Sequence, residues 1–187
     1  MGSDARNVFA GRLVRLRSIE PEDWETFYTW NADSEAARTG YWIPFPGSKE
    51  QQRQWAARLA AQDGTDDIFF YVIETLAGET VGSISTHECD RRNGTFTYGV
   101  IIAREHQRNR YASEAIRLLL GYFFRELRYQ KVTARVYSFN EASLALHERL
   151  GFVREGCLRR MRYTNGRHFD EVIFGMTAEE FAASISS

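Results

Sequence analysis

Several features that would assign a chain to a metal-binding, secreted or membrane class are missing from this sequence of 187 residues. Its two cysteines, Cys89 and Cys157, have no metal-ligand spacing, and with four scattered histidines they predict no structural zinc site. No apolar run approaches the roughly 20 residues that a membrane helix needs, and no signal peptide is visible. We therefore expect a reduced, cytoplasmic chain with neither a metal nor a membrane partner, the alternative being a disulfide between the two cysteines.

A strong charge of one sign is missing as well, because 24 Lys and Arg residues nearly balance 25 Asp and Glu residues. The net charge of −1 gives no global attraction to nucleic acid. There is no repeat, linker or low-complexity segment, and 43% apolar with 14% aromatic residues argues against disorder. We expect one domain over residues 1–187, with residues 1–10 either disordered or an added extension.

Hydrophobic periodicity predicts strands and helices along the whole chain. Pro21 and the acids after it favour a helix start, and Ser48 with Gln51 has the spacing of a capping box. Asn165-Gly166 predicts a tight hairpin turn, and Gly99 indicates either a bulge or a close approach of the backbone to a ligand. The expected strands are 12–17, 69–75, 80–88, 95–102, 131–136, 153–162 and 171–176, with a long helix after the fourth strand and a short one at 178–184.

The stretch Asn140 to Phe152 predicts a short amphipathic helix that ends at Gly151. Ser143 and His147 are four residues apart and share one helical face, so a hydroxyl and an imidazole lie one turn apart. The alternative is a core-facing helix in which both groups are satisfied internally.

Upstream, a basic turn from Gln107 to Ala112 opens the long helix. Its unpaired backbone N–H groups and the helix dipole favour an anion, and the small side chain of Ala112 allows close approach. Arg108 and Arg110 add positive charge. The alternative is a solvated basic turn.

Together the two stretches resemble the GNAT acetyltransferases, which use acetyl-CoA. The phosphate-loop pattern of that family, Gln/Arg-x-x-Gly-x-Gly/Ala, falls on Gln107 to Ala112, and its second pattern, Asn-x-x-Ser/Ala-x-x-x-Tyr-x-x-x-Gly-Phe, falls on Asn140 to Phe152. The chain departs from the family at Arg110, where Gly is usual, and at His147, where many members have Tyr. The resemblance implies an α/β (α+β) fold with a mixed, mostly antiparallel seven-stranded sheet, helices on both faces and one splayed strand pair.

The tail, residues 151–176, resembles the ribosomal-protein N-terminal acetyltransferases and the spermidine acetyltransferases, with their pattern GF-x-x-EG…R…G…D. With the early YWIPFP, the resemblance covers nearly the whole chain. It implies an acceptor that is a protein N-terminus, a polyamine or another small amine, and a monomer or homodimer.

For acetyl-CoA, the resemblance implies that the strands 95–102 and 131–136 diverge near Ile102 and Tyr137 and bind the pantetheine arm through their backbones. The backbone of Val100 to Ile102 would polarise the acetyl carbonyl. The residues expected to bind acetyl-CoA are Val100, Ile101, Ile102, Gln107, Arg108, Asn109, Arg110, Tyr111, Ala112, Asn140 and Ser143.

Three residues are candidates for moving protons. The resemblance makes Ser143 the donor to the CoA thiolate and His147 a second donor, with a half-buried packing His as the alternative. Glu88 ends the third strand, and its place resembles a glutamate of the spermidine acetyltransferases. It is a candidate base, and the alternative is an ordinary exposed acid at a strand end.

The acceptor side is less constrained by the sequence. Aromatic residues either line it or belong to the core, and acids either attract a cationic amine or are simply solvated. An arginine-rich strand is either a solvated face or a contact for an acidic acceptor or protein tail. The aromatic residues are Trp30, Tyr41, Trp42 and Phe45, and the acids are Asp33, Glu35 and Glu88. The arginines of the strand are Arg154, Arg159, Arg160 and Arg162.

The leading hypothesis is an acetyl-CoA-dependent N-acetyltransferase that acts on a primary amine by direct attack in a ternary complex. One alternative is a regulatory module that binds acyl-CoA without turnover, which Arg110 and His147 favour. The other is an acyltransferase that uses a longer acyl-CoA.

Overall fold

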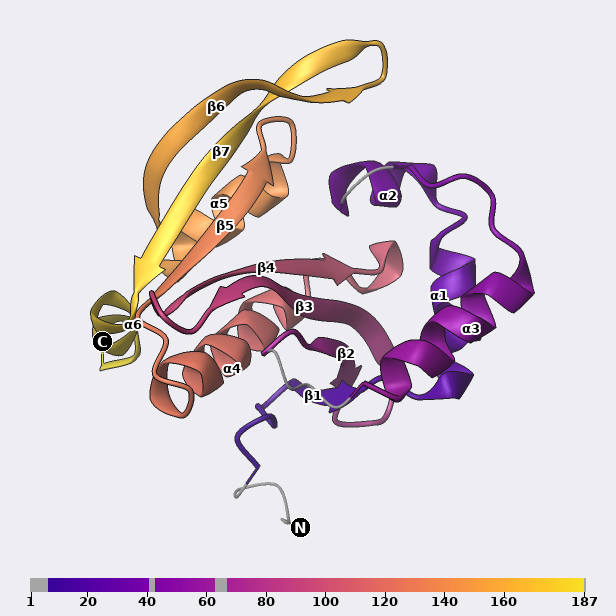
Figure 1. The fold of residues 1–187 in the computed structure, drawn as a ribbon, viewed down its shortest axis with the longest axis horizontal. Coiled ribbons are helices and arrows are strands. Elements are labelled where there is room, and N and C mark those ends of the chain that lie inside the picture. The colour runs from indigo at the N-terminus through magenta and orange to yellow at the C-terminus, as the bar shows by residue number, and fades with distance from the viewer. Residues whose placement is uncertain (1–6, 41–42, 63–66, 187) are drawn as a thin grey trace. The chain divides into compact units, whose positions relative to one another are not determined.

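The strands of the protein form one seven-stranded sheet in the order β1-β2-β3-β4-β5-β7-β6 (Figure 1). The structure is a computed structural model and describes residues 7–40, 43–62 and 67–186. Pairing is antiparallel between β1 and β2, β2 and β3, β5 and β7, and β6 and β7, whereas β4 and β5 are parallel. The predicted α/β class and the mixed, mostly antiparallel sheet are therefore confirmed.

The strands are β1 (Val14–Ser18), β2 (Phe70–Thr75), β3 (Thr80–Asp90), β4 (Thr95–Ile102), β5 (Lys131–Tyr137), β6 (Val153–Thr164) and β7 (Arg167–Thr177). The helices are α1 (Trp24–Trp30), α2 (Ser34–Gly40), α3 (Lys49–Ala60), α4 (Tyr111–Arg125), α5 (Glu141–Leu150) and α6 (Ala178–Ser186), with 3-10 turns η2 (Pro21–Asp23) and η3 (Arg104–His106). None of the helices described here is long and apolar enough to span a membrane.

The chain divides into two compact units. The first comprises Met1–Ser85 and Val100–Leu119, and the second comprises Thr86–Gly99 and Leu120–Ser187. The elements β3, β4 and α4 contribute residues to both units. The single domain expected over residues 1–187 stays a prediction.

In the first unit, α1 and α3 pack on the sheet through an aromatic cluster (Figure 1). Phe27 lies at its centre, with ring centroids 5.3 Å from Trp30, 5.2 Å from Trp55 and 5.7 Å from Phe70. Edge-to-face contacts of this kind add to the hydrophobic stabilisation of the core. Trp30 therefore packs against the core, as the core alternative given for it expects.

The second unit has its core on the inner residues of β4, β5 and β7. Phe96 stacks on Phe123 of α4 at 4.3 Å, and Phe174 of β7 is 1% exposed. The turn between β6 and β7 has left-handed φ angles of 49° at Asn165 and 76° at Gly166. This is the tight hairpin turn that the sequence predicts, and both strands are longer than expected.

Helix α2 is missing from the predicted elements. Asp33 caps it, because its Oδ1 accepts hydrogen bonds from the N–H groups of Glu35 and Ala36, both at 3.0 Å. Beyond α2, Tyr41 and Trp42 lie outside the described residues, and Phe45 is 96% exposed.

Residues 7–10, expected to be disordered or added, are described and contact the sheet. The ring of Phe9 lies 5.5 Å from that of Tyr71, and its carbonyl accepts a hydrogen bond from the N–H of Leu16. These four residues therefore contact the first unit, where the side chain of Phe9 is partly buried.

Candidate active site

Helix α5 presents Ser143 and His147 on one face, as predicted. The Asn140 side chain caps its start by accepting a hydrogen bond from the Ser143 N–H at 3.1 Å. Gly151 ends the helix with a left-handed φ of 90°, a conformation that favours glycine. The pattern from Asn140 to Gly151 thus sets the length of the helix and fixes both side chains within it.

The His147 ring is buried, 3% exposed, between Phe174 and the start of its own helix. Its Nδ1 lies 2.8 Å from the carbonyl oxygen of Ser143, and its Nε2 lies 2.8 Å from the hydroxyl of Tyr98. Because a carbonyl only accepts, Nδ1 carries the proton and donates. In the neutral ring Nε2 is then an acceptor, and the Tyr98 hydroxyl donates to it.

Burial sets the protonation state of this pair. It lowers the pKa of His147, and the hydrogen bond to the Ser143 carbonyl only partly opposes that effect. Burial also raises the pKa of Tyr98. Both side chains are therefore neutral near pH 7. Neutral His147 has no N–H left for a thiolate, so the geometry favours the packing alternative over the donor role predicted for it.

Ser143 is only partly buried, and its hydroxyl is not committed to the imidazole. Its Oγ lies 3.4 Å from Nδ1 of His147, a long contact. Since Nδ1 is the donor, Oγ can only accept there. The Ser143 O–H therefore keeps its proton for another acceptor.

The basic turn before α4, in the first unit, has an unusual backbone. Arg108 and Arg110 have left-handed φ angles of 66° and 64°. This conformation costs a non-glycine residue about 1 kcal/mol. The family pattern has Gly where Arg110 stands, so Arg110 keeps the conformation that glycine would adopt freely.

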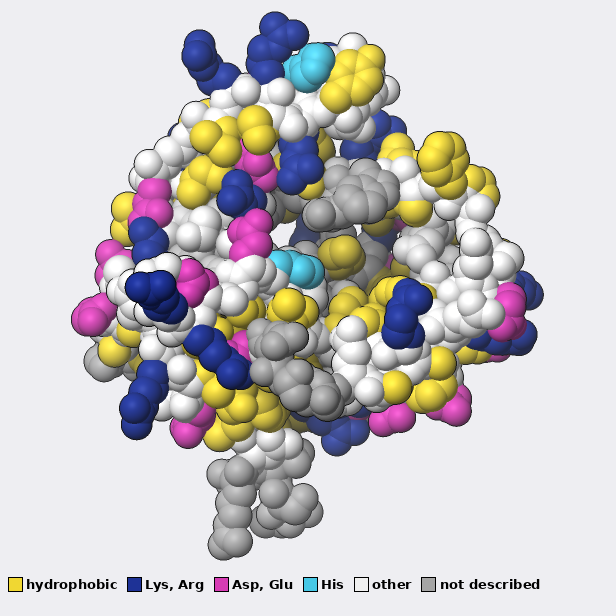
Figure 2. Space-filling view, in the orientation of Figure 1, with side chains coloured by type: hydrophobic (Ala, Val, Ile, Leu, Met, Phe, Trp, Pro, Cys, Tyr) yellow, Lys and Arg dark blue, Asp and Glu magenta, His cyan; other side chains and the backbone are white. Residues whose placement is uncertain are grey.

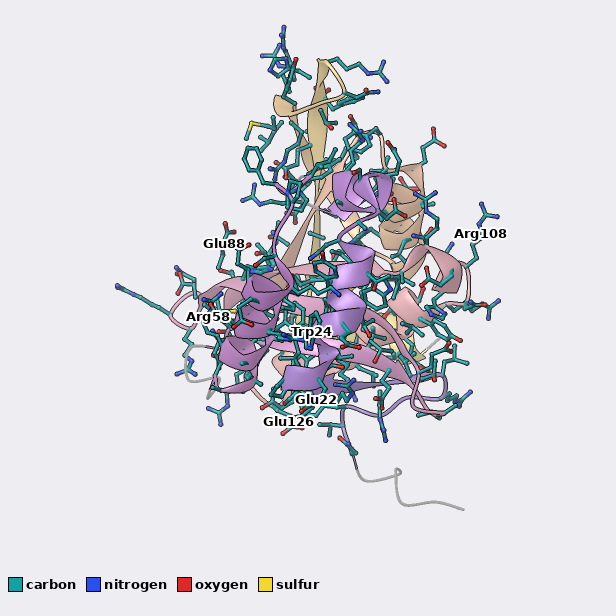
Figure 3. The ribbon with its side chains drawn as sticks, turned by 90° about the vertical axis from the view of Figure 1, so that its right-hand side faces the viewer. Glu22, Trp24, Arg58, Glu88, Arg108 and Glu126 are labelled. Carbon is teal, nitrogen blue, oxygen red and sulfur yellow. The ribbon has the colours of Figure 1, made fainter. Side chains whose placement is uncertain are left out.

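The start of α4 leaves donors available for an anion. The first helical bond runs from the Glu114 N–H to the Arg110 carbonyl at 3.2 Å, so the N–H groups of residues 111–113 have no partner within the helix. Gln107 and Asn109 brace the turn with bonds to the carbonyls of Ile102 and His106. Arg108 projects away from the ribbon into solvent (Figure 3).

Glu114, in the first turn of α4, has a role that sequence reasoning missed. Its carboxylate accepts hydrogen bonds from the backbone N–H groups of Arg12, Leu13 and Val14, at 2.9, 2.6 and 2.8 Å. A side chain at Gly11 would overlap this carboxylate. Glu114 thereby ties the start of β1 to the start of α4, about a hundred residues away in sequence.

The predicted oxyanion segment, Val100 to Ile102, has a close backbone neighbour in β3. A Cβ atom at Gly82 would overlap the carbonyl oxygen of Ile101. Glycine at position 82 therefore permits this approach. In the second unit, the parallel ladder between β4 and β5 joins Thr95–Thr97 to Lys131–Thr133. The predicted divergence beyond it stays a prediction.

Glu88 lies on β3 and is solvated. Its carboxylate is 3.8 Å from the Arg135 guanidinium, and its side chain is 64% exposed. Its φ of 49° is left-handed, which marks an irregularity in the strand. An exposed acid in a loose ion pair matches the alternative given above, and a role as base stays a prediction.

Asp33 and Glu35, considered above for attracting a cation, both have arginine partners. Asp33 binds Arg104 through two bonds of 2.7 and 2.9 Å, which lower the pKa of the carboxyl. Glu35 pairs with Arg38 at 3.2 Å. Their charges are therefore largely compensated. Among the described residues no group of three or more His, Cys, Asp and Glu side chains is arranged to hold a metal ion.

Comparison with known proteins decides the family. The profile of the acetyltransferase (GNAT) domain matches residues 13–153. The chain belongs to the GNAT acetyltransferases. It is 40% identical over 177 residues to the prophage-derived, uncharacterised N-acetyltransferase YokL of Bacillus subtilis, covering 95% of this chain and 97% of YokL.

One further relative matches in sequence and one in fold. YdaF of Bacillus subtilis, provisionally named a ribosomal N-acetyltransferase, is 30% identical over 176 residues, 90% of this chain and 93% of YdaF. The spermidine N-acetyltransferase of Vibrio cholerae, solved with CoA and spermine, matches the fold with a TM-score of 0.78 at 24% identity, covering 90% of this chain and 98% of that one. This GNAT chain is therefore an acyltransferase.

Proposed function

We propose that this GNAT chain transfers the acetyl group of acetyl-CoA to a primary amine by direct attack in a ternary complex. One observation carries the proposal: the turn before α4 keeps a left-handed backbone at Arg110 and leaves the N–H groups of residues 111–113 without helical partners. A backbone of this kind at a helix start suits a diphosphate. CoA in the solved Vibrio cholerae relative agrees with this choice of substrate.

The residues present fit acetyl-CoA. The amides of residues 111–113 and the helix dipole would hold the diphosphate, with Arg108 and Arg110 exposed beside them to supply charge. We assign the backbone of Val100 to Ile102 to the acetyl carbonyl. The caps of α5 hold Asn140 and Ser143 in place for the pantetheine arm and the sulfur.

The reaction needs a neutral amine and a protonated leaving group. The amine nitrogen forms a bond to the acetyl carbon, the carbon–sulfur bond breaks, and the sulfur takes the electron pair. The amine gives one proton to solvent or a base, and the CoA sulfur gains one. We assign the second transfer to Ser143, whose O–H is not used by the imidazole and whose oxygen takes a proton back from solvent as it gives one to the sulfur. His147 is not assigned this role, because its one N–H donates to the Ser143 carbonyl. His147 is then a positioning residue for the first turn of α5.

The choice of amine determines how much a base must contribute. An alkyl amine with a pKa near 10.4 costs about 4 to 5 kcal/mol to deprotonate at pH 7, whereas an α-amine with a pKa near 8 costs only about 1 kcal/mol. Glu88 is the candidate base, and it is exposed and paired with Arg135. A solvated acid provides little driving force, so the structure favours an α-amine such as a protein N-terminus.

Calorimetry followed by a thiol-release assay tests the proposal. Acetyl-CoA should bind with a micromolar Kd, and thiol release should depend on both acetyl-CoA and an added amine. Binding without thiol release for any amine would favour the non-catalytic module. Faster release from a longer acyl-CoA would favour the other alternative, and no affinity for CoA would exclude all three.

A further inference from the structure

The β6–β7 hairpin continues beyond the last residue of β5 as an arm, which we define as residues 158–168. Tyr137 ends β5 and pairs with Glu171 of β7, which in turn pairs with Leu158 of β6. The hairpin beyond that register has no neighbour in β5 and projects past its end (Figure 1). Because α5 starts a few residues after Tyr137, the arm begins at the same end of β5 as Ser143.

The root of the arm is fixed by specific contacts. The N–H of Ser138 donates to the Asp170 carbonyl at 3.0 Å, and the rings of Phe139 and Phe169 meet edge to face at 4.7 Å. The Arg162 guanidinium lies 4.8 Å from the centre of the Tyr137 ring and donates to buried Glu171 at 3.3 Å. The arm is therefore held in a defined direction relative to the start of α5.

A bulge in β6 turns arginine side chains outward. Leu158 pairs with Glu171 and Arg162 with Phe169, so residues 159–161 lie opposite the single residue Asp170. Arg160 has a left-handed φ of 57°, and its N–H donates to Asp170 Oδ1 at 2.9 Å. A bulge changes the direction in which the side chains of a strand point. The left-handed conformation of Arg160 costs about 1 kcal/mol, and the hydrogen bond to Asp170 helps to hold it.

The arm is basic although the chain as a whole has a net charge of −1. It contains Arg159, Arg160, Arg162 and Arg167 and neither Asp nor Glu. Among the described residues no carboxylate pairs with the side chains of Arg159, Arg160 or Arg167. Figure 2 shows the dark-blue cationic side chains at the tip of the hairpin.

Apolar side chains are exposed next to these arginines in the sequence. Leu158, Met161 and Tyr163 are 40%, 53% and 67% exposed. Protein interfaces are enriched in Tyr, Met and Arg, and exposed apolar groups next to charges mark such surfaces. A phosphate backbone needs charge alone, so the mixture favours a polypeptide over a nucleic acid.

From this arrangement we infer that the arm binds acidic residues of a polypeptide, and that the acceptor is a protein N-terminus followed by Asp or Glu residues. The second clause rests on the proposed function. Arginine binds carboxylates with paired hydrogen bonds, whereas a polyamine, being a cation, is repelled by the arm. The acceptor is then a protein with acidic residues after its N-terminus, and not a polyamine.

Peptide binding tests the arm independently of catalysis. Two fluorescent peptides share their first residues and continue with either Glu or Gln, and N-acetylation prevents transfer. By anisotropy at low salt, the Glu peptide should bind about tenfold more tightly or better. Arg159→Glu with Arg167→Glu should abolish the difference, and the matched double variant Arg92→Glu with Arg128→Glu, at exposed sites in the same unit, should keep it.

Several outcomes would overturn the inference. These are equal binding of the two peptides, equal loss in the control variant, or tighter binding of a single-stranded oligonucleotide of matched charge. A dimer that the arm substitutions dissociate would assign the surface to a second copy instead. Thermal melting shows whether the arm variants are still folded when they fail to bind. Arg159→Ala and Arg167→Ala remove the charges with a smaller change than the substitutions to Glu.

Unblocked peptides then link the arm to catalysis. In the thiol-release assay, kcat/KM should favour the Glu peptide, and the arm variant should lose that preference. If other amines release thiol but the Glu peptide has no advantage, the inference fails while the proposed function stands. If no amine releases thiol and the Glu peptide still binds the arm, the proposed function and the acceptor assignment fail together.

Discussion

At the scale of single residues, His147 shows how one substitution within a family pattern changes a local hydrogen-bond network. The imidazole donates to the Ser143 carbonyl and accepts from Tyr98, and it is packed against Phe174. A buried residue with two partners of fixed role is sensitive to any change that removes one partner. The interaction of Tyr98 with His147 should therefore be measurable as a contribution to the free energy of unfolding.

Replacing His147 with Phe should destabilise the protein by about 1 to 3 kcal/mol, because the buried Tyr98 hydroxyl loses its acceptor. The double variant with Tyr98→Phe should recover part of that loss, since both polar groups are then absent. Chemical denaturation of the single and double variants measures both values. Additive losses would show that the two residues do not interact.

The same pair predicts a pH dependence. The folded-state pKa of His147 is below its ordinary value of about 6.5, so below pH 6.5 the unfolded chain takes up the proton first. The stability of the wild type should therefore fall as the pH drops through that range. Burial also lowers the pKa of His87, so the wild type must be compared with His147→Phe, which keeps His87. In melting experiments between pH 5 and pH 8, the stability of His147→Phe should change less with pH than that of the wild type. Parallel curves would contradict the assignment.

Arg110 allows the backbone and the charge of the diphosphate turn to be separated. Arg110→Gly removes both the charge and the left-handed strain, whereas Arg110→Ala removes only the charge. We expect the Gly variant to be about 1 kcal/mol more stable than the Ala variant, and to bind acetyl-CoA within about tenfold of the wild type. Complete loss of acetyl-CoA binding in calorimetry would instead indicate a specific contact from Arg110.

At the scale of elements, helix α4 has two functions at one end. Its first amides are free for an anion, and Glu114 in the same turn accepts three backbone bonds from residues 12–14. A carboxylate near a helix N-terminus is also favoured by the helix dipole. The start of α4 is thus held rigidly against the start of β1 where the diphosphate is proposed to bind.

Glu114→Ala should lower the free energy of unfolding by about 2 kcal/mol, because three N–H groups lose a charged acceptor and water replaces it only in part. Glu114→Gln, which keeps one acceptor, should cost less. The matched control is Glu126→Ala near the other end of α4, where the side chain is exposed and the cost should be below about 0.5 kcal/mol (Figure 3). Urea unfolding midpoints compare the three variants. Equal costs for Glu114→Ala and Glu126→Ala would refute the role of Glu114.

The elements also show which features a sequence can predict. The capping box of Ser48 with Gln51, the Asn165-Gly166 turn and the shared face of Ser143 and His147 depend on neighbouring residues, and all three were predicted and are confirmed. The Glu114 bonds and the Tyr98 partner of His147 join residues about 100 and 49 positions apart. No local spacing encodes such contacts, and so the sequence left the donor role and the packing role of His147 both open.

At the scale of the whole molecule, the first unit depends on charge pairs at the start of the sheet. Arg17 donates to Glu74 at 2.7 Å and to Asp23 through two bonds of 2.8 Å, and Arg15 also pairs with Glu74. Burial alone would raise the pKa of both carboxyls, but the arginine bonds outweigh it and lower them. The network therefore stabilises the fold while these acids are ionised.

Acid should weaken the network. Because the folded-state pKa values are lowered, the stability that these acids supply is present above their ordinary values near pH 4 and is lost as the pH falls further. Arg17→Met should lower the free energy of unfolding by about 3 kcal/mol at pH 7, because it leaves Glu74 buried with fewer partners. The further loss of stability at low pH should then be smaller than in the wild type. Arg58→Met, at an exposed site on α3, is the control. An unchanged acid transition in Arg17→Met would show that the network is not its source.

The central claim, that the chain moves an acetyl group from acetyl-CoA to an amine with Ser143 protonating the sulfur, is tested most directly by product mass spectrometry with parallel thiol release. We expect one acetylated amine for each thiol released. We further expect Ser143→Ala to lower kcat by at least about tenfold with little change in acetyl-CoA affinity. Thiol release without an acetylated product, or an unchanged kcat in Ser143→Ala, would contradict the account.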